Sequence, residues 1–119
     1  MDTKPTGCIC FFGAYDLDAT HSFYSDSLGL ELWKDQGVCR IYSVPGGGYL
    51  GFCEHMTVNA SDKSPIITLL FEDVDQVYRK LCTAKRSVAS KPQYNKKFGI
   101  YHFFMEDPNH YTVEIQKFL

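Results

Sequence analysis

The sequence has no long apolar run, no concentration of charge of one sign and no paired-cysteine motif. No stretch approaches the roughly twenty consecutive apolar residues that span a bilayer, and the first residues, MDTKPTG, lack the apolar core of a signal peptide. The formal net charge of −2 means that the chain has no excess of positive charge with which to bind nucleic acid or an anionic membrane. We therefore expect a cytoplasmic protein that binds neither nucleic acid nor membranes.

The five cysteines are an odd set without a C-x-x-C pair: Cys8, Cys10, Cys39, Cys53 and Cys82. This favours reduced thiols in a reducing compartment over a disulfide framework or a zinc knuckle. We interpret them chiefly as small apolar residues. With 119 residues, the chain is long enough for one domain with a proper core.

The first half of the chain predicts the element order β-α-β-β-β. The apolar run CICFFGAY, residues 8–15, is too short for a helix and predicts a strand. Asp16 can cap the following helix, and Gly29 lies where that helix would end in a left-handed residue. Three short extended segments follow, LELWKD, VCRIYSV and YLGFCE, separated by turn residues.

The second half predicts the same order. PIITLLF is a strand, and EDVDQVYRKLCTA is a helix in which Asp73 and Gln76 have the spacing of a capping box. After an irregular stretch with a poorly marked strand, GIYHFFM and YTVEIQKF close the chain around a turn at 106–110. Two similar halves indicate an internal duplication, in which each helix covers one face of its sheet.

These motifs, in this order, resemble the vicinal oxygen chelate superfamily, which includes glyoxalase I, extradiol dioxygenases and the bleomycin and fosfomycin resistance proteins. The residues that carry the resemblance are FYSDSLGLEL, YLGF, FEDVDQVYRKL and MEDPNHYTVEI, within residues 7–118. The resemblance implies one α+β domain, 1–119, with β-α-β-β-β modules at 7–55 and 65–118. The modules would form a curled, incompletely closed barrel-like sheet with helices on the outside, in a homodimer.

The resemblance also locates the positions that bind metal in metal-dependent members of the family. On this chain they fall at Ile9, Gly51, Ile66 and Glu114. Catalytic metal centres generally need three protein ligands drawn from His, Asp, Glu or Cys, and Glu114 alone qualifies. We therefore expect no cofactor, and a site that recognises its ligand by shape and contact.

The family's strand orientation also predicts which side chains face the ligand, because side chains alternate between the two faces of a sheet. The predicted wall is mostly aromatic and aliphatic, which suits a planar or hydrophobic molecule, unless large rings simply fill the space. The predicted ligand-binding residues are Ile9, Phe11, Tyr49, Gly51, Cys53, Ile66, Thr68, Leu70, Tyr101, Phe103, Thr112 and Glu114.

Glu114 is the candidate catalytic residue, as a hydrogen-bond acceptor or a general base that faces a bound small molecule. Alternatively, it is a relic of the family site, satisfied by a tyrosine hydroxyl or a water. His102 should face the helix, although a flipped register would place it beside Glu114 as a base or ligand. Cys53 is either a nucleophile or a buried, inert thiol.

The sequence therefore predicts a glyoxalase/bleomycin-resistance-like protein that binds a small hydrophobic or aromatic molecule in a metal-independent pocket. The alternative is a metal-dependent enzyme, a lactoylglutathione-lyase-like lyase or isomerase or a dioxygenase, with a rearranged ligand set drawn from His102, His55 and Glu114. A divalent metal enters only under this alternative. A third possibility is an interaction module whose pocket is vestigial.

Overall fold

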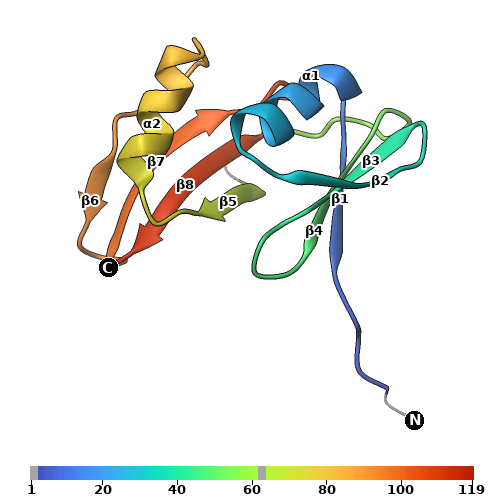
Figure 1. Cartoon of the computed structure of the whole chain (residues 1–119), viewed down its shortest axis with the longest axis horizontal. Helices are drawn as coiled ribbons and strands as arrows, with labels where there is room; N and C mark the ends of the chain where they lie inside the picture. Colours follow the sequence, from blue (N-terminus) through green and yellow to red (C-terminus); the bar gives the residue numbers. More distant parts are fainter. Residues whose placement is uncertain (1–2, 62–63) are drawn as a thin grey trace. The chain divides into compact units, whose positions relative to one another are not determined.

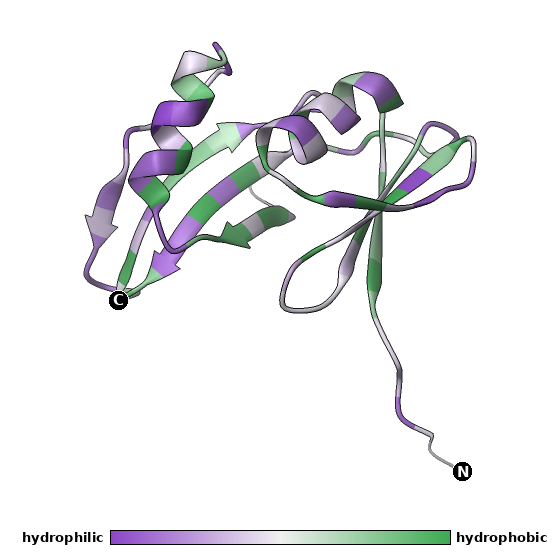
Figure 2. Ribbon diagram, viewed as in Figure 1, coloured by the Kyte–Doolittle hydropathy of each residue, from purple (hydrophilic) through white to green (hydrophobic). Residues whose placement is uncertain are grey.

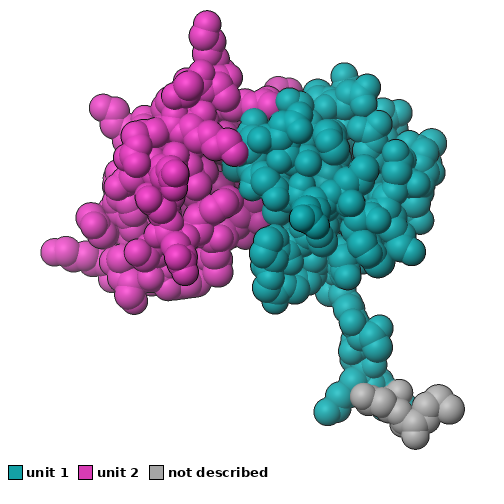
Figure 3. Space-filling model, in the orientation of Figure 1, with its two compact units in different colours: residues 1–59 teal, residues 60–119 magenta. Residues whose placement is uncertain are grey.

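The chain divides into two compact units in a computed structural model that describes residues 3–61 and 64–119 (Figure 3). Unit 1 is the part up to Asn59, and unit 2 is the part from Ala60. Residues 1–2 of the predicted domain, and 62–63 between the predicted modules, lie outside the described residues. Each unit holds one β-α-β-β-β set, so the predicted α+β fold is confirmed (Figure 1).

Unit 1 is a four-stranded mixed sheet with strand order β1-β4-β3-β2. Strands β1 and β4 are parallel, whereas β4 pairs with β3, and β3 with β2, in antiparallel fashion. The elements are β1 (Ile9–Gly13), α1 (Leu17–His21), the π-helical η1 (Ser22–Ser27), β2 (Glu31–Asp35), β3 (Cys39–Ser43) and β4 (Tyr49–Cys53).

Local sequence explains where the first helix begins and ends. The Asp16 side chain accepts hydrogen bonds from the backbone amides of Asp18 and Ala19, at 2.9 and 3.1 Å, and so caps α1. Gly29, with φ +80°, follows η1 in the left-handed region, as its position in the sequence predicts. Both ends of the helical segment are therefore determined by neighbouring residues.

Unit 2 repeats this topology, with strand order β5-β8-β7-β6. The Asp73 side chain accepts a hydrogen bond from the Gln76 amide at 2.9 Å and caps α2. The poorly marked strand is three residues long and lies at the sheet edge as β6. The elements are β5 (Ile66–Leu70), α2 (Val74–Thr83), β6 (Gln93–Asn95), β7 (Ile100–Glu106) and β8 (Thr112–Phe118).

Each sheet buries one face beneath its own helix. In unit 1 the Tyr24 ring stacks on Phe52 with centroids 4.6 Å apart, and in unit 2 the Tyr78 ring meets Phe103 edge-on at 5.4 Å. The bands of alternating hydropathy along β8 follow this two-sided arrangement (Figure 2). We name the opposite side of each sheet its helix-distal face.

Register determines which side chains reach the helix-distal faces, because directly paired residues point to the same side. Phe11 pairs with Gly51, and Gly51 with Ile41, so odd-numbered residues of β1, β3 and β4 form this face in unit 1. Thr68 and Phe104 both pair with Glu114, so even-numbered residues of β5, β7 and β8 form it in unit 2. The helices of the described residues do not have the length and hydrophobicity that a bilayer-spanning helix needs.

Candidate functional site

The helix-distal face of unit 2 carries a buried polar cluster of Thr68, His102 and Glu114. The His102 Nδ1 atom lies 2.6 Å from Glu114 Oε2, and the Thr68 hydroxyl donates a hydrogen bond to Oε1 at 2.8 Å. The side chains of His102 and Glu114 are each 9% exposed. Both oxygens of the carboxylate are thus engaged, which satisfies the hydrogen-bonding demand of a buried acid.

Glu114 is therefore an acid with a partner on each of its oxygens, although it lies within a strand and is buried. The contact joins one donor and one acceptor, so an ionised Glu114, which only accepts hydrogen bonds, is paired with a proton on Nδ1 of His102. Because Glu114 fixes the orientation of the imidazole through Nδ1, the opposite ring nitrogen, Nε2, is held in a fixed direction. Such an arrangement can recognise a polar group of a ligand or move a proton.

The surroundings of the cluster are largely apolar. Phe104 packs against the His102 ring with centroids 5.2 Å apart, and Ile66 and Leu70 are exposed on the same face. A cavity of about 420 Å³ adjoins Phe104 and Thr112, and this volume lies in the range typical of small-molecule sites. Its other lining residues are Ala60, Ala89, Met105, Glu106 and His110.

Two of the predicted ligand-binding residues, Tyr101 and Phe103, face the wrong way. Their positions in β7 are odd, so they point toward α2, where Phe103 meets Tyr78 and the Tyr101 hydroxyl donates to Asp75 Oδ1 at 2.5 Å. This hydrogen bond raises the pKa of Tyr101 to about 12. The prediction that His102 faces the helix is wrong for the same reason, and the flipped register that would place it beside Glu114 is the one observed.

The helix-distal face of unit 1 gathers five of the predicted ligand-binding residues: Ile9, Phe11, Tyr49, Gly51 and Cys53. The Phe11 ring lies across Gly51, where a Cβ atom would overlap it. The absence of a side chain at Gly51 therefore leaves room for the Phe11 ring. Phe11 and Ile9 are 44% and 37% exposed, so aromatic and aliphatic surface of this face is accessible.

Sequence reasoning missed Trp33, the single tryptophan of the chain. Its indole stacks on Tyr49 with ring centroids 4.3 Å apart, and it is 46% exposed. The register of β2 shifts between Leu32 and Lys34, so simple alternation does not assign a face to Trp33. The stacking nevertheless adds an indole to the aromatic surface around Tyr49.

The prediction that all five cysteines are reduced is wrong for two of them. Cys39 and Cys53 are directly opposite each other on β3 and β4, with Cα atoms 4.1 Å apart, and form a disulfide. Cys53 is therefore neither a free nucleophile nor an unmodified thiol in this state. Cys8, Cys10 and Cys82 carry free thiols.

Metal-ligand positions inferred from the resemblance supply few donors. Ile9 and Gly51 belong to unit 1 and have no coordinating group, and Ile66 places an apolar side chain beside Thr112. Within residues 3–61 and 64–119, no group of three His, Cys, Asp or Glu donors includes Glu114. His55, proposed as a ligand under the enzymatic alternative, instead lies beside Cys39 in unit 1.

In each unit a helix covers one face of the sheet. The opposite face carries the polar cluster and its neighbouring cavity in unit 2, and exposed aromatic side chains in unit 1. Two such β-α-β-β-β units define a paired-module α+β protein. The family model for the Glyoxalase/Bleomycin resistance protein/Dioxygenase superfamily matches residues 10–115. The chain belongs to this superfamily. Among curated proteins, the comparison finds no match.

Solved structures with the same fold span nearly the whole chain. A glyoxalase/bleomycin resistance protein/dioxygenase from Nocardioides has a TM-score of 0.76 at 16% identity, over 100% of this chain and 87% of that one. Lactoylglutathione lyase from Agrobacterium tumefaciens has a TM-score of 0.72 at 21% identity, over 98% and 96%. A superfamily protein from Alicyclobacillus acidocaldarius has a TM-score of 0.74 at 17% identity, over 99% and 96%. At these identities the likeness concerns the fold.

Proposed function

We propose that this protein binds a small hydrophobic or aromatic molecule in a metal-independent pocket. The observation that carries the proposal is the Thr68–Glu114–His102 cluster, set among apolar side chains on the helix-distal face of unit 2. A few fixed polar groups within apolar walls are the usual composition of a small-molecule site. The cluster would orient the ligand, and the apolar surface would supply most of the binding energy.

The occupancy of the Glu114 oxygens supports metal independence. Oε1 accepts from Thr68, and Oε2 accepts from His102, so binding an ion here would require breaking at least one of these contacts. A divalent ion would also need further ligands, which Ile9, Gly51 and Ile66 cannot provide. No cofactor is therefore part of the proposal.

The pairing of His102 with Glu114 favours a second candidate, a metal-dependent lyase, isomerase or dioxygenase of this superfamily. Imidazole nitrogen and carboxylate oxygen are both ligands of zinc and other divalent ions, and here they lie side by side. In that case an ion held by these two residues would act as a Lewis acid toward the substrate.

We also propose a cytoplasmic location and a homodimer. The edge strand β2 supports association, because Leu32 and Trp33 are 40% and 46% exposed on a strand with one unpaired side. Sedimentation equilibrium at micromolar concentration would give twice the 13.6 kDa chain mass for a dimer. A monomer across the accessible concentration range would contradict this part of the proposal.

The deciding experiment is a thermal-shift screen of planar aromatic and aliphatic compounds, run with and without EDTA. A ligand must raise the melting temperature, because binding to the native state stabilises it. We expect a shift that EDTA does not alter and that Glu114→Gln reduces, while the exposed Glu31→Gln control keeps it. A shift abolished by EDTA, together with stoichiometric metal by mass spectrometry, would favour the enzyme, and no shift with any compound would favour a vestigial pocket.

A further inference from the structure

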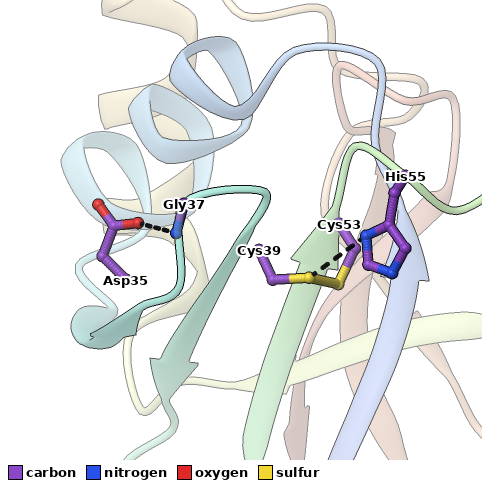
Figure 4. Close-up of a disulfide and its surroundings, with 5 residues drawn as sticks. All are labelled: Asp35, Gly37, Cys39, Cys53 and His55. Carbon is purple, nitrogen blue, oxygen red and sulfur yellow. Dashed lines mark hydrogen bonds between the residues drawn. A yellow bond between two sulfur atoms is a disulfide. The ribbon is translucent and has the colours of Figure 1, made fainter.

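Unit 1 contains a second cluster of reactive groups, formed by Cys39, Cys53 and His55 (Figure 4). The two cysteines are joined across β3 and β4, and the imidazole of His55 lies beside them, with Nδ1 3.7 Å from Cys39 Sγ. The two sulfurs and a ring nitrogen all lie within 4.8 Å of one another. Among the described residues, this is the one place where three such donors converge.

We propose that, after reduction of the disulfide, Cys39, Cys53 and His55 bind one Zn²⁺ ion. Zinc takes thiolate sulfur at about 2.3 Å and imidazole nitrogen at about 2.0–2.1 Å in tetrahedral geometry, which puts a sulfur and a nitrogen ligand about 3.6 Å apart. Nδ1 of His55 already lies 3.7 Å from Cys39 Sγ. The imidazole is thus at ligand distance, and the remaining change is for the two sulfurs to separate to about 3.8 Å.

Burial and charge favour a divalent ion over two bare thiolates. Cys39 and Cys53 are 6% and 1% exposed, so a pair of negative charges at these positions would be strongly unfavourable. Two thiolates, a neutral imidazole and Zn²⁺ sum to zero charge. Zinc is a better match than Ca²⁺ or Mg²⁺, because those ions select oxygen ligands.

His55 is exposed, which gives the ion a route from solvent and leaves a fourth coordination position for water. The site would therefore be open, with three protein ligands. Such a set resembles catalytic zinc sites in ligand number, whereas structural zinc sites are generally closed by four protein ligands.

The backbone around His55 is fixed before any metal arrives. The Glu54 amide donates to the Val38 carbonyl at 2.9 Å, and the Met56 amide donates to the Cys53 carbonyl at 3.4 Å. The carbonyl of Met56 passes so close to Gly13 that a Cβ there would lie 2.7 Å from its oxygen. Holding His55 in place reduces the entropy that metal binding must overcome.

The turn before Cys39 is held in a similar way. The Asp35 side chain accepts a hydrogen bond from the Gly37 amide at 2.9 Å (Figure 4). The Gln36 amide donates to the Cys39 carbonyl at 2.7 Å. Both sides of the cluster therefore lie on hydrogen-bonded backbone, and the thiols stay opposite each other once the covalent bond between them is cleaved.

Loading requires a reductant, and a dithiol supplies it. One thiolate of the dithiol attacks a sulfur of the Cys39–Cys53 bond, which releases one cysteine thiolate and forms a mixed disulfide with the other. The second thiol of the dithiol then attacks the dithiol sulfur of that mixed disulfide and releases the second cysteine. The protein gains two electrons and two protons as two thiols, and the dithiol becomes a disulfide. Zn²⁺ then displaces the two thiol protons, which pass to the solvent.

The test starts from the variant Cys8→Ser/Cys10→Ser/Cys82→Ser, in which Cys39 and Cys53 are the remaining cysteines. The protein is reduced with a phosphine, freed of reductant without oxygen, and titrated with Co²⁺ and then Zn²⁺. We expect one equivalent of Co²⁺ with thiolate-to-metal absorption in the near ultraviolet, displaced by Zn²⁺. The oxidised protein should show no such binding.

Variants in the same background locate the site. Cys39→Ser should lose the thiolate absorption and stoichiometric Zn²⁺ binding. His55→Ala should weaken Zn²⁺ binding without unfolding the protein, because His55 is exposed. Glu114→Gln should retain full binding, which separates this site from the metal-dependent version of the proposed function. Circular dichroism and thiol titration check that each reduced variant is folded.

Three results would overturn the inference. Reduced, folded protein that binds no Zn²⁺ would do so, as would binding that persists unchanged in Cys39→Ser. Failure of the disulfide to reduce in the native protein, seen as absence of two new thiols, would also contradict it. None of these results bears on ligand binding at Glu114, so the proposed function can fail or hold separately.

Discussion

His102 and Glu114 are diagonal neighbours on β7 and β8, two residue pairs apart in the register, and their side chains meet at 2.6 Å on the same side of the sheet. His102 pairs with Gln116, and Glu114 with Phe104. The contact thus depends on the antiparallel register and not on closeness in the sequence. Thr68 reaches the same carboxylate from the parallel strand β5 on the other side.

Replacing Glu114 with Gln should destabilise the protein by about 1–3 kcal/mol, the cost of leaving a buried polar group poorly paired. The amide retains one acceptor oxygen and introduces a donor that faces either Thr68 or His102. Urea denaturation followed by circular dichroism measures the change. The exposed Glu31→Gln control should stay within about 0.5 kcal/mol of the parent, and an equal loss in both variants would contradict the structural role of Glu114.

Alanine at Gly51 should destabilise by about 1–3 kcal/mol, because its Cβ overlaps the Phe11 ring, which must move aside. Gly13→Ala should cost more, since there the obstacle is the Thr57 and Met56 backbone, which has less freedom to shift. Gly7→Ala is the matched control, with its nearest atom, Tyr49 Cε2, 3.9 Å from the added Cβ. The order Gly13 > Gly51 > Gly7 in free energy lost is the expected outcome of chemical denaturation.

Tyr101 should titrate about two pH units above an ordinary phenol, because its hydroxyl donates to Asp75 and the hydrogen bond raises its pKa to about 12. Since the folded protein holds this proton more tightly, the contribution to stability is complete below pH 10. It declines as the pH rises through 12. NMR titration of the Tyr101 ring should show the pKa falling toward 10 in Asp75→Asn but not in Glu72→Gln.

Trp33 should report ligand binding to the helix-distal face of unit 1. It is the single tryptophan, it stacks on Tyr49, and it is half-exposed, so a planar ligand on this face would change its emission. We expect saturable quenching or a spectral shift during titration with those aromatic compounds of the screen whose thermal shift Glu114→Gln leaves unchanged. Phe11→Ala should weaken the apparent affinity, and an affinity unchanged in Phe11→Ala would place the ligand elsewhere.

The order of elements and both helix caps could be predicted from sequence. So could the two-sided character of β8, because polar and apolar residues alternate clearly from Thr112 to Gln116. The face of each residue in β7 could not. Its residues Tyr101 to Met105 are apolar or aromatic apart from His102, so they give no alternation, and a shift of one residue exchanges the two faces. The strand orientation that the resemblance implies puts Tyr101 and Phe103 on the ligand side and His102 on the helix side, one residue out of step with the structure.

The sequence does contain one signal for the disulfide, the position of the two cysteines relative to the glycine turn. Cys39 and Cys53 are equally far from Gly46, and the β3–β4 hairpin closes symmetrically about that turn, with Ser43 opposite Tyr49. This symmetry predicts a contact between the two cysteines only when the register of the hairpin is known. The bulge that positions Trp33 in β2 has no comparable sequence marker.

The turn between β7 and β8 is tied down by one buried carboxylate. Asp107 is 4% exposed, and its Oδ1 atom accepts from the amides of Asn109 and Tyr111, at 2.8 and 2.9 Å. Adding a single residue inside this turn would slide one strand past the other and carry His102 out of reach of Glu114. The glycines at 46–47 are exposed and lie in a turn closed by backbone hydrogen bonds, between Val44 and Gly47 and between Val44 and Gly48, so they are the better place to insert a peptide tag or a reporter domain.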